Sequence, residues 1–450
     1  MALSGPWTGW SKAASRTFGF LGYEWEPAAG ELKLKYALDD RPLAEYFRFP
    51  LPEAPVRANQ PALTGAMEFL HWVAGISYWK AGCPPQLRFS DRRPTVDQAA
   101  WLNELYREGL AEFAWHNGLS VERFEVFRGQ DGGSTAPEEA GPAALTDAYL
   151  VPMGGGKDSL VAWSRLARRG LKPVTAQIGS AALIQNVAAT TGGPHLVVER
   201  RMDPALARLN AKGAWNGHVP ITAINAAALI ILALLHGLRF VVFANERSAD
   251  EPTLVNAQGL PVNHQFAKTL RFERMLDRWV QRWIASDLRV FSLLRRDREL
   301  AICREFADLE RFHGVFSSCN RNFHLDGART RRWCGQCPKC HFVFLGLAPF
   351  LSPEAMRRMF GADLLADWQQ ISGFRALLAL DGRKPFECVG EAVEARAAVC
   401  ALAAHRRWRE HAIVRQLFAE LAGIEVPSVA SLCQPGGDHL IPEALFNAAG

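Results

Sequence analysis

The stretch that decides the fold class of this chain is YLVPMGGGKDSLV, which spans residues 149–161. The apolar run at 149–153 predicts a buried strand, and the apolar spacing from 158 to 169 predicts a helix. A strand that passes through a glycine turn into a helix presents backbone N–H groups and the positive end of the helix dipole to an anion. Lys157 adds a positive charge at the same point. The stretch therefore predicts a phosphate-binding site.

This loop differs from the two commonest nucleotide-binding patterns. A Walker A loop needs glycine at position 151 and serine or threonine at position 158, where this chain has Val151 and Asp158. The glycine spacing of a dinucleotide fingerprint is also missing. The loop resembles the SGGKDS loop of the PP-loop ATP pyrophosphatases, with Gly154 in place of the family's serine. The alternative is an ordinary glycine-rich turn.

The resemblance to PP-loop enzymes implies that ATP binds here and is cleaved to AMP and pyrophosphate. The residues that it implies for the ATP phosphates are Gly154, Gly155, Gly156, Lys157 and Ser159. It implies that Asp158 is a ligand of Mg²⁺ or lies on the ribose side of the nucleotide.

Strands and helices alternate downstream of the loop. Strands are expected at 173–178, 195–198, 240–244 and 290–294, and helices at 181–190, 221–236, 267–285 and 297–309. This alternation predicts an α/β fold with a parallel sheet, right-handed crossovers and helices on both faces. Ligands in such folds bind at the carboxyl ends of the strands.

The flanking segments have different patterns. Alternating residues at 15–50 predict strands, 62–79 and 95–117 predict helices, and 121–127 predicts a short strand. We expect an N-terminal α+β domain at 1–128, a Gly- and Pro-rich linker at 129–145, a PP-loop (HUP-like) ATP-binding α/β domain at 146–345, and a helical C-terminal region at 346–450. Thr95 is the expected N-cap of its helix.

Charge and hydrophobicity narrow the class of protein. The chain has 51 Lys+Arg against 46 Asp+Glu, and this mild excess does not indicate nucleic-acid binding. The most apolar stretch, 221–238, is interrupted by Asn225 and His236 and is short for a membrane span. The N-terminus lacks the apolar core of a signal peptide. We therefore expect a cytoplasmic protein without membrane or nucleic-acid partners.

Four of the nine cysteines are clustered in the sequence. CGQCPKC at 334–340 supplies Cys334, Cys337 and Cys340, and Cys319 lies upstream. Four thiolates at this spacing favour a structural zinc site, while an iron–sulfur cluster or no metal are the alternatives. Similar cysteines close the nucleotide domain of 7-cyano-7-deazaguanine synthase, another PP-loop enzyme. The odd total argues against a disulfide framework.

Polar loops follow the predicted strands at their carboxyl ends. Glu246 is a candidate Mg²⁺ ligand together with Asp158, and Arg247 is a candidate for a phosphate or carboxylate. Asn263 in the next loop is a further candidate for substrate or Mg²⁺. For each of them a solvated loop side chain is the alternative.

Several motifs together resemble one family, the UDP-N-acetyl-α-D-muramoyl-L-alanyl-L-glutamate epimerases (MurL family) of bacterial peptidoglycan biosynthesis. They are PMGGGKDSLV (152–161), GHVP (217–220), ANERSA (244–249), VNHQ (262–265), HGVFSSCNRNF (313–323), RWCGQCPKCHFVFLGLAPFL (332–351) and KPFECVGE (384–391). The resemblance covers nearly the whole chain.

The family resemblance implies an ATP- and Mg²⁺-dependent inversion of the terminal L-Glu of the UDP-muramoyl dipeptide to D-Glu. It implies an acyl-adenylate intermediate, release of AMP and pyrophosphate, no pyridoxal phosphate, and a substrate handed on by an L-glutamate-adding muramoyl ligase. Adenylation removes the carboxylate charge that opposes loss of the α-proton, so that a base can abstract it and an acid can return one.

The residues that perform this proton transfer are not fixed by the sequence. Low-grade catalytic candidates beside Lys157 are His264, Lys268 and Cys388. Alternatives for the whole chain are another PP-loop adenylating enzyme, either a ligase or a nucleobase- or RNA-modifying enzyme, and a nucleotide-binding module without catalysis.

Overall fold

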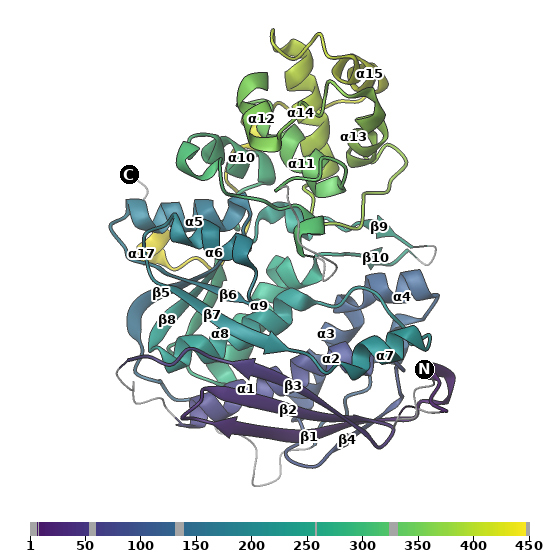
Figure 1. Ribbon diagram of the computed structural model, residues 1–450, viewed down its shortest axis with the longest axis vertical. Coiled ribbons are helices and arrows are strands. Elements are labelled where there is room, and N and C mark those ends of the chain that lie inside the picture. Colours follow the sequence, from purple (N-terminus) through teal and green to yellow (C-terminus); the bar gives the residue numbers. More distant parts are fainter. Residues whose placement is uncertain are drawn as a thin grey trace.

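Nine strands form one continuous sheet in a computed structural model that describes residues 7, 9–53, 60–130, 139–256, 259–323 and 332–446. Their order is β11-β8-β5-β6-β7-β3-β2-β1-β4 (Figure 1). The parallel part contains β5 (Thr146–Pro152), β6 (Val174–Ile178), β7 (His195–Arg201), β8 (Leu238–Phe243) and β11 (Arg289–Ser292). The predicted α/β class and its parallel strands are confirmed.

The N-terminal strands extend this sheet. They are β1 (Thr17–Glu26), β2 (Glu31–Leu38), β3 (Arg41–Arg48) and β4 (Gln86–Phe89). β3 pairs antiparallel with β7, and the buried Glu45 of β3 accepts a hydrogen bond from Arg200 of β7 at 2.5 Å. The expected boundary between residues 128 and 146 therefore separates two segments of the chain whose strands belong to the same sheet.

The N-terminal helices are α1 (Gln60–Ala74), α2 (Ile76–Trp79), α3 (Val96–Gly109) and α4 (Ala111–Asn117). Thr95 caps α3 in a capping box, as its sequence predicts. The strand expected at 121–127 is wrong, because residues Val121–Phe124 form a 3-10 helix. Both backbone groups of Phe127 bond to the side chain of Asn103, at 2.9 and 3.0 Å, so no partner strand is needed.

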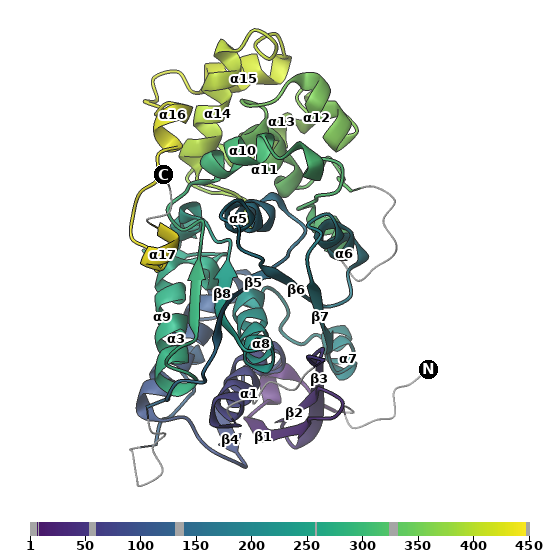
Figure 2. The ribbon, with the colours of Figure 1, turned by 90° about the vertical axis from the view of Figure 1, so that its left-hand side faces the viewer.

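The central helices are α5 (Lys157–Arg168), α6 (Ala182–Ala189), α7 (Ala205–Ala211), α8 (Ile221–Leu235), α9 (Leu270–Trp283) and α10 (Glu299–Ala307), and a short hairpin of β9 (Leu254–Val255) and β10 (Pro261–Val262) precedes α9. The apolar α8 packs against α1 and β8 in the interior (Figure 2). A helix that is apolar on all sides is stable in water only when it is buried in this way. Within the described residues, no helix is long and apolar enough to span a membrane.

The C-terminal region is helical, as expected. It contains α11 (Pro338–Leu347), α12 (Pro353–Phe360), α13 (Ile371–Leu377), α14 (Ala392–Ala404), α15 (Ala412–Glu420), α16 (Val429–Leu432) and α17 (Glu443–Phe446). Most of it forms a cap at the top of Figure 1, and α17 returns to the side of the sheet. Of the expected linker, residues 131–138 lie outside the described residues.

Candidate functional site

The glycine loop joins β5 to α5 in the conformation that its sequence predicts. Gly155 has a φ of +80°, and a Cβ on it would lie 2.8 Å from Leu183 Cδ2. A Cβ on Gly156 would lie 2.5 Å from Ser318 Oγ, whereas a Cβ on Gly154 would meet nothing within 4 Å. Gly156 is the N-cap of α5 and provides no side-chain cap. The first N–H groups of α5 therefore lie beside a loop whose glycines are required at two of three positions.

Lys157 is buried at the start of α5. Its Nζ donates to Asp158 Oδ1 at 2.5 Å and to Glu299 Oε2, which belongs to α10. Burial disfavours the charged ammonium, but Asp158 and Glu299 outweigh this and raise the pKa of Lys157 well above its usual value. The ammonium is therefore a permanent positive charge directly below the loop.

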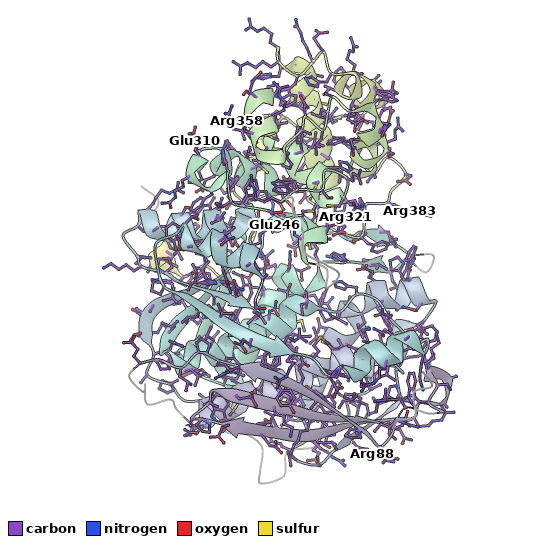
Figure 3. All side chains as sticks on the ribbon, in the orientation of Figure 1. Arg88, Glu246, Glu310, Arg321, Arg358 and Arg383 are labelled. Atoms are coloured by element: carbon purple, nitrogen blue, oxygen red, sulfur yellow. The ribbon has the colours of Figure 1, made fainter. Side chains whose placement is uncertain are left out.

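Three carboxylates surround this ammonium. Glu246 follows β8 and is buried, and Glu299 is buried beside it, while the Asp158 side chain keeps 31% of its surface exposed. Burial and the neighbouring carboxylates raise the pKa values of Glu246 and Glu299. Figure 3 labels Glu246 near the level where the C-terminal helices meet the sheet. The Lys157 ammonium is thus the cation at the centre of this group of carboxylates.

Arg247 and Asn263 occupy other positions. The Arg247 backbone bonds to Asp297 O at 2.8 Å, and its guanidinium packs against Gly436 and Gly437. Asn263 donates to Ala249 O at 3.0 Å and accepts from the Gln265 N–H at 2.7 Å. Asn263 thus braces its own loop, whereas buried Arg247 Nε lacks a hydrogen-bond partner among the described residues.

His264, Lys268 and Cys388 come together although they are far apart in the sequence. The Gln265 side chain, next to His264, donates to Val389 O, next to Cys388, and the Cys388 thiol lies close enough to His264 and Lys268 for both to affect its pKa. Burial opposes a charged thiolate, but Lys268, Lys339 and His264 hold the pKa of Cys388 well below its usual value. The three low-grade candidates therefore form one cluster, with a thiolate between two cations.

Glu112 of α4 supports this cluster from the opposite side of His264. His264 Nδ1 is hydrogen-bonded to Glu112 Oε2, and the His264 ring lies 4.4 Å from that of His218. Burial lowers the pKa of His264, but Cys388 and Glu112 outweigh burial and raise this pKa to about 9. Burial and the neighbouring His264 lower the pKa of His218 to about 4. At neutral pH the cluster thus holds one imidazolium and one neutral imidazole.

Lys268 connects the Cys388 cluster to the glycine loop. Burial lowers the pKa of Lys268, but Cys388, Glu246 and Asp158 lie close enough to raise it above its usual value. Lys268 therefore interacts both with the Cys388 cluster and with the carboxylates below the glycine loop.

The loop that carries Cys388 is fixed by contacts on three sides. Phe386 packs against His116 of α4, with ring centroids 4.7 Å apart. Glu387 accepts a hydrogen bond from Asn320, and Val389 O accepts one from Gln265 at 3.3 Å. The thiol thus lies where the N-terminal, central and C-terminal parts of the chain meet.

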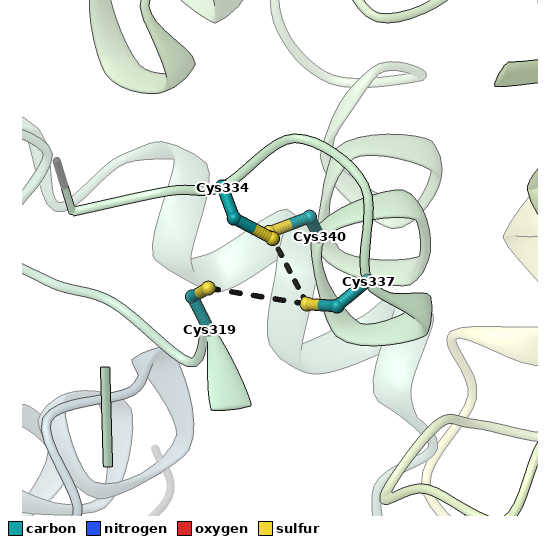
Figure 4. A group of neighbouring side chains, drawn as sticks. All are labelled: Cys319, Cys334, Cys337 and Cys340. Atoms are coloured by element: carbon teal, nitrogen blue, oxygen red, sulfur yellow. Dashed lines mark hydrogen bonds between the residues drawn. The ribbon is translucent and has the colours of Figure 1, made fainter. Parts of the chain in front are cut away.

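Cys319, Cys334, Cys337 and Cys340 form the expected cluster (Figure 4). Their sulfurs are separated by 3.4 Å for the pair 337–340, 3.7 Å for 334–340 and 3.9 Å for 319–337. Cys337 is the N-cap of α11, where the helix dipole favours negative charge. All four are free thiols, and they are placed to bind one metal ion.

The cysteine cluster also supports a wall of the site. Ser317 and Ser318 precede Cys319, and the Ser317 N–H donates to Gly155 O at 2.9 Å. The Ser317 hydroxyl donates to Arg332 O at 2.6 Å and so joins the two cysteine-bearing segments. A metal bound here would hold the wall against the glycine loop.

Sequence patterns missed two of the residues that complete the site. Glu112 did carry a signal, because it lies between Ala111 and Phe113 on a buried stretch of helix, where a carboxylate needs a partner. Glu299 carried none, since it stands in a charged run after a strand. His218 was noted in GHVP but was expected to be structural.

Comparisons with known proteins confirm the resemblance drawn from the motifs. Models of the MurL N-terminal domain and the MurL C-terminal domain match residues 10–293 and 315–431. Three relatives are each named UDP-N-acetyl-alpha-D-muramoyl-L-alanyl-L-glutamate epimerase. The one from Xanthomonas oryzae pv. oryzae is 42% identical over 96% of both chains. The one from Micromonospora sp. is 40% identical over 94% of this chain and 96% of its own. The one from Salinispora tropica is 38% identical over 96% of this chain and 95% of its own. The chain belongs to the MurL family.

Proposed function

We propose that this chain is an ATP-dependent epimerase that inverts the terminal L-Glu of UDP-N-acetylmuramoyl-L-alanyl-L-glutamate to D-Glu through an acyl adenylate, as part of peptidoglycan precursor synthesis in the cytoplasm. The observation that carries the proposal is the meeting of two groups of residues. A phosphate-type loop with a buried lysine faces a thiolate–imidazolium cluster, and Lys268 lies between them. The names of the relatives supply the substrate.

The first group is suited to adenylation in the manner of PP-loop enzymes. Gly154, Gly155 and Gly156 with the N–H groups of α5 and the Ser159 hydroxyl receive the ATP phosphates, and Lys157 neutralises their charge. Asp158 and Glu246 hold Mg²⁺, with Glu299 as the buried partner of Lys157. The glutamyl α-carboxylate attacks the α-phosphorus and pyrophosphate leaves.

The second group is suited to proton transfer at Cα. His264, Lys268 and Cys388 are the acid–base candidates, because they lie together beside the proposed adenylation site. Lys268 also supplies a positive charge for the enolate oxygen that develops when the α-proton is removed.

The bulky remainder of the substrate has space beside this cluster. A cavity of about 910 Å³ is lined by Ala111, Trp115 and Val262, among others. Ala111 directly precedes Glu112, and Val262 lies two residues before His264, so the cavity is lined by neighbours of the proton-transfer group. We assign the UDP-muramoyl portion to it.

Zinc is the metal that we assign to the four cysteines. Bonds of about 2.3 Å in a tetrahedral thiolate site place sulfurs about 3.8 Å apart. The sulfur separations of 3.4–3.9 Å match that value. The role proposed for zinc is structural, since all four ligands come from the chain.

The proposed function is tested by incubating the protein with labelled ATP, Mg²⁺ and UDP-muramoyl-L-alanyl-L-glutamate, the product of an L-glutamate-adding ligase, in D₂O. AMP and pyrophosphate are expected, with deuterium at Cα of the glutamyl residue and D-Glu after hydrolysis. Formation of ADP, or full retention of the original Cα hydrogen, would contradict the epimerase assignment.

A further inference from the structure

Cys388, His264 and Glu112 are linked in the order of a nucleophilic triad. The Gln265 side chain, next to His264, donates to Val389 O, next to Cys388, at 3.3 Å, and so holds the Cys388 loop against the His264 segment. His264 lies close enough to lower the pKa of the Cys388 thiol, and its Nδ1 is hydrogen-bonded to the Glu112 carboxylate. A nucleophile beside a base that is itself oriented by a third group is the general arrangement of covalent acyl transfer. The His264 and Glu112 side chains keep only 14% and 9% of their surface exposed, so their orientation is fixed by packing.

The position of this triad adds a second argument. Lys268 interacts with both its thiolate and Asp158, so the thiolate lies beside the place where an acyl adenylate would form. A thiolate is a much stronger nucleophile than water, and an acyl adenylate is an activated acyl donor. A cysteine with a purely structural role would need neither the His264 imidazolium nor the Lys268 ammonium beside it.

We propose that Cys388 is the nucleophile that accepts the glutamyl acyl group from the adenylate, so that Cα is inverted while the substrate is held as a thioester. This inference rests on the proposed function and specifies its covalent step. It gives the thiol a different task from the proton transfers left to His264 and Lys268.

The step balances with groups already named. The Cys388 sulfur attacks the acyl carbon, the bond from that carbon to the AMP oxygen breaks, and the His264 proton passes to the departing phosphate. Neutral His264 then removes the α-proton, and Lys268 stabilises the enolate oxygen. That proton exchanges with solvent. A water molecule protonates the opposite face of Cα, and the His264 imidazolium gives its proton to the hydroxide that this leaves, which makes His264 neutral again. Water finally cleaves the C–S bond, which regenerates the thiolate and the imidazolium.

The nearest alternative role for the thiol is that of a simple base acting on the adenylate. The two roles differ in what happens to AMP. If Cys388 only moves protons, an adenylate formed in its absence is still hydrolysed and AMP is released without inversion. If Cys388 is the acyl acceptor, its loss blocks AMP release together with inversion.

The test uses the full-length protein with ATP, Mg²⁺ and the UDP-muramoyl dipeptide. Acid quenching within the first turnover, followed by peptide mass spectrometry, is expected to find the acylated dipeptide on the peptide that contains Cys388. In Cys388→Ala, AMP release and Cα deuteration are both expected to fall at least about 10²-fold. Dipeptide-dependent exchange of pyrophosphate into ATP should continue, because the glycine loop is intact.

The matched control is Cys400→Ser, which changes another partly buried cysteine on α14. It is expected to keep the adduct and both activities. Continued AMP release by Cys388→Ala without Cα deuteration would overturn the thioester and leave the epimerase standing. Failure of the wild-type protein to form AMP and pyrophosphate would reject the proposed function itself. If the alanine variant does not fold, Cys388→Ser replaces it in the test. AMP release is then compared with pyrophosphate exchange in the same way.

Discussion

The glycine loop and the Cys388 cluster are built in opposite ways. The loop is contiguous in sequence, and its geometry follows from one strand, three glycines and one helix N-terminus. The Cys388 cluster draws Glu112, His264, Lys268 and Cys388 from α4, the segment before α9 and the loop before α14. A site for a common ligand such as ATP can be local, whereas groups that must surround one carbon atom of a particular substrate are assembled by tertiary packing.

Loss of the metal proposed for the four cysteines is expected to have the largest effect, because the segments that it would join contact both regions. Cys337→Ser should destabilise the fold by several kcal/mol, on the order of 4, and abolish both half-reactions. Thermal unfolding and elemental analysis measure this, with Cys433→Ser as the control outside the cluster.

The same elemental analysis bears on the Cys388 cluster. We expect about one zinc ion per chain. Glu112, His218 and His264 also have ligand atoms within 4.8 Å of one another. A second tightly bound metal that is lost in Glu112→Gln would contradict the triad.

Replacing Lys157 changes the glycine loop and leaves the residues of the Cys388 cluster in place. Lys157→Gln removes the charge below the phosphates, and turnover should fall about 10²–10³-fold. The variant also leaves Asp158 and Glu299 without their cation, so the melting temperature should fall as well. Lys172→Gln, an exposed lysine just beyond α5, should change neither. Undiminished AMP formation in Lys157→Gln would remove Lys157 from the ATP site.

Replacing Glu112 changes the Cys388 cluster and leaves the residues of the glycine loop in place. Without its carboxylate the pKa of His264 falls from about 9 and less thiolate forms at Cys388. Glu112→Gln should slow alkylation of Cys388 by iodoacetamide at pH 7 and lower Cα exchange at least about 10-fold. Glu425→Gln, which changes an exposed carboxylate of the C-terminal region, is the control. Alkylation as fast as in the wild type would mean that Glu112 does not act through His264.

The thiolate–imidazolium pair gives the second region a characteristic pH dependence. In the unfolded chain His264 and Cys388 titrate near 6.5 and 8.5. Folding raises the pKa of His264 to about 9 and lowers that of Cys388. Between about pH 6.5 and 8.5 both states hold one proton on the pair, so its contribution to stability is constant.

Outside that plateau the contribution declines on both sides. Above about pH 8.5 the folded state binds more protons than the unfolded state, so stability falls as the pH rises. Below about pH 6.5 the unfolded state binds more protons, so stability falls as the pH is lowered. Either slope reaches at most about 1.4 kcal/mol per pH unit. The measurement is the free energy of unfolding of the wild type minus that of Cys388→Ala/His264→Gln. A difference that varies steadily between pH 6.5 and 8.5 would contradict the ion pair.

The smallest effects are expected within the glycine loop. Gly154→Ser restores the serine of the PP-loop pattern into open space and should change stability by less than about 0.5 kcal/mol. Gly155→Ala forces a Cβ onto a left-handed residue and should cost about 1–2 kcal/mol. Equal tolerance of the two changes would mean that the loop does not need its observed conformation.

These contrasts explain how much the sequence could predict. The strands and helices around 149–169, the cysteine cluster and the helical C-terminal region follow local patterns and are confirmed. The strand expected at 121–127 is wrong because the Asn103 side chain takes over the backbone bonds of Phe127. The pairing of β3 with β7 and the contact of Glu112 with His264 join residues 151–155 positions apart, and no local pattern encodes such contacts.

The most direct test of the account measures its two half-reactions side by side in Lys157→Gln and His264→Gln. One assay follows dipeptide-dependent exchange of pyrophosphate into ATP, and the other follows exchange of the glutamyl Cα hydrogen. We predict that Lys157→Gln loses both exchanges, whereas His264→Gln keeps the first and loses the second. Cα exchange that persists in Lys157→Gln, or equal loss of both exchanges in His264→Gln, would contradict two cooperating regions acting on one substrate.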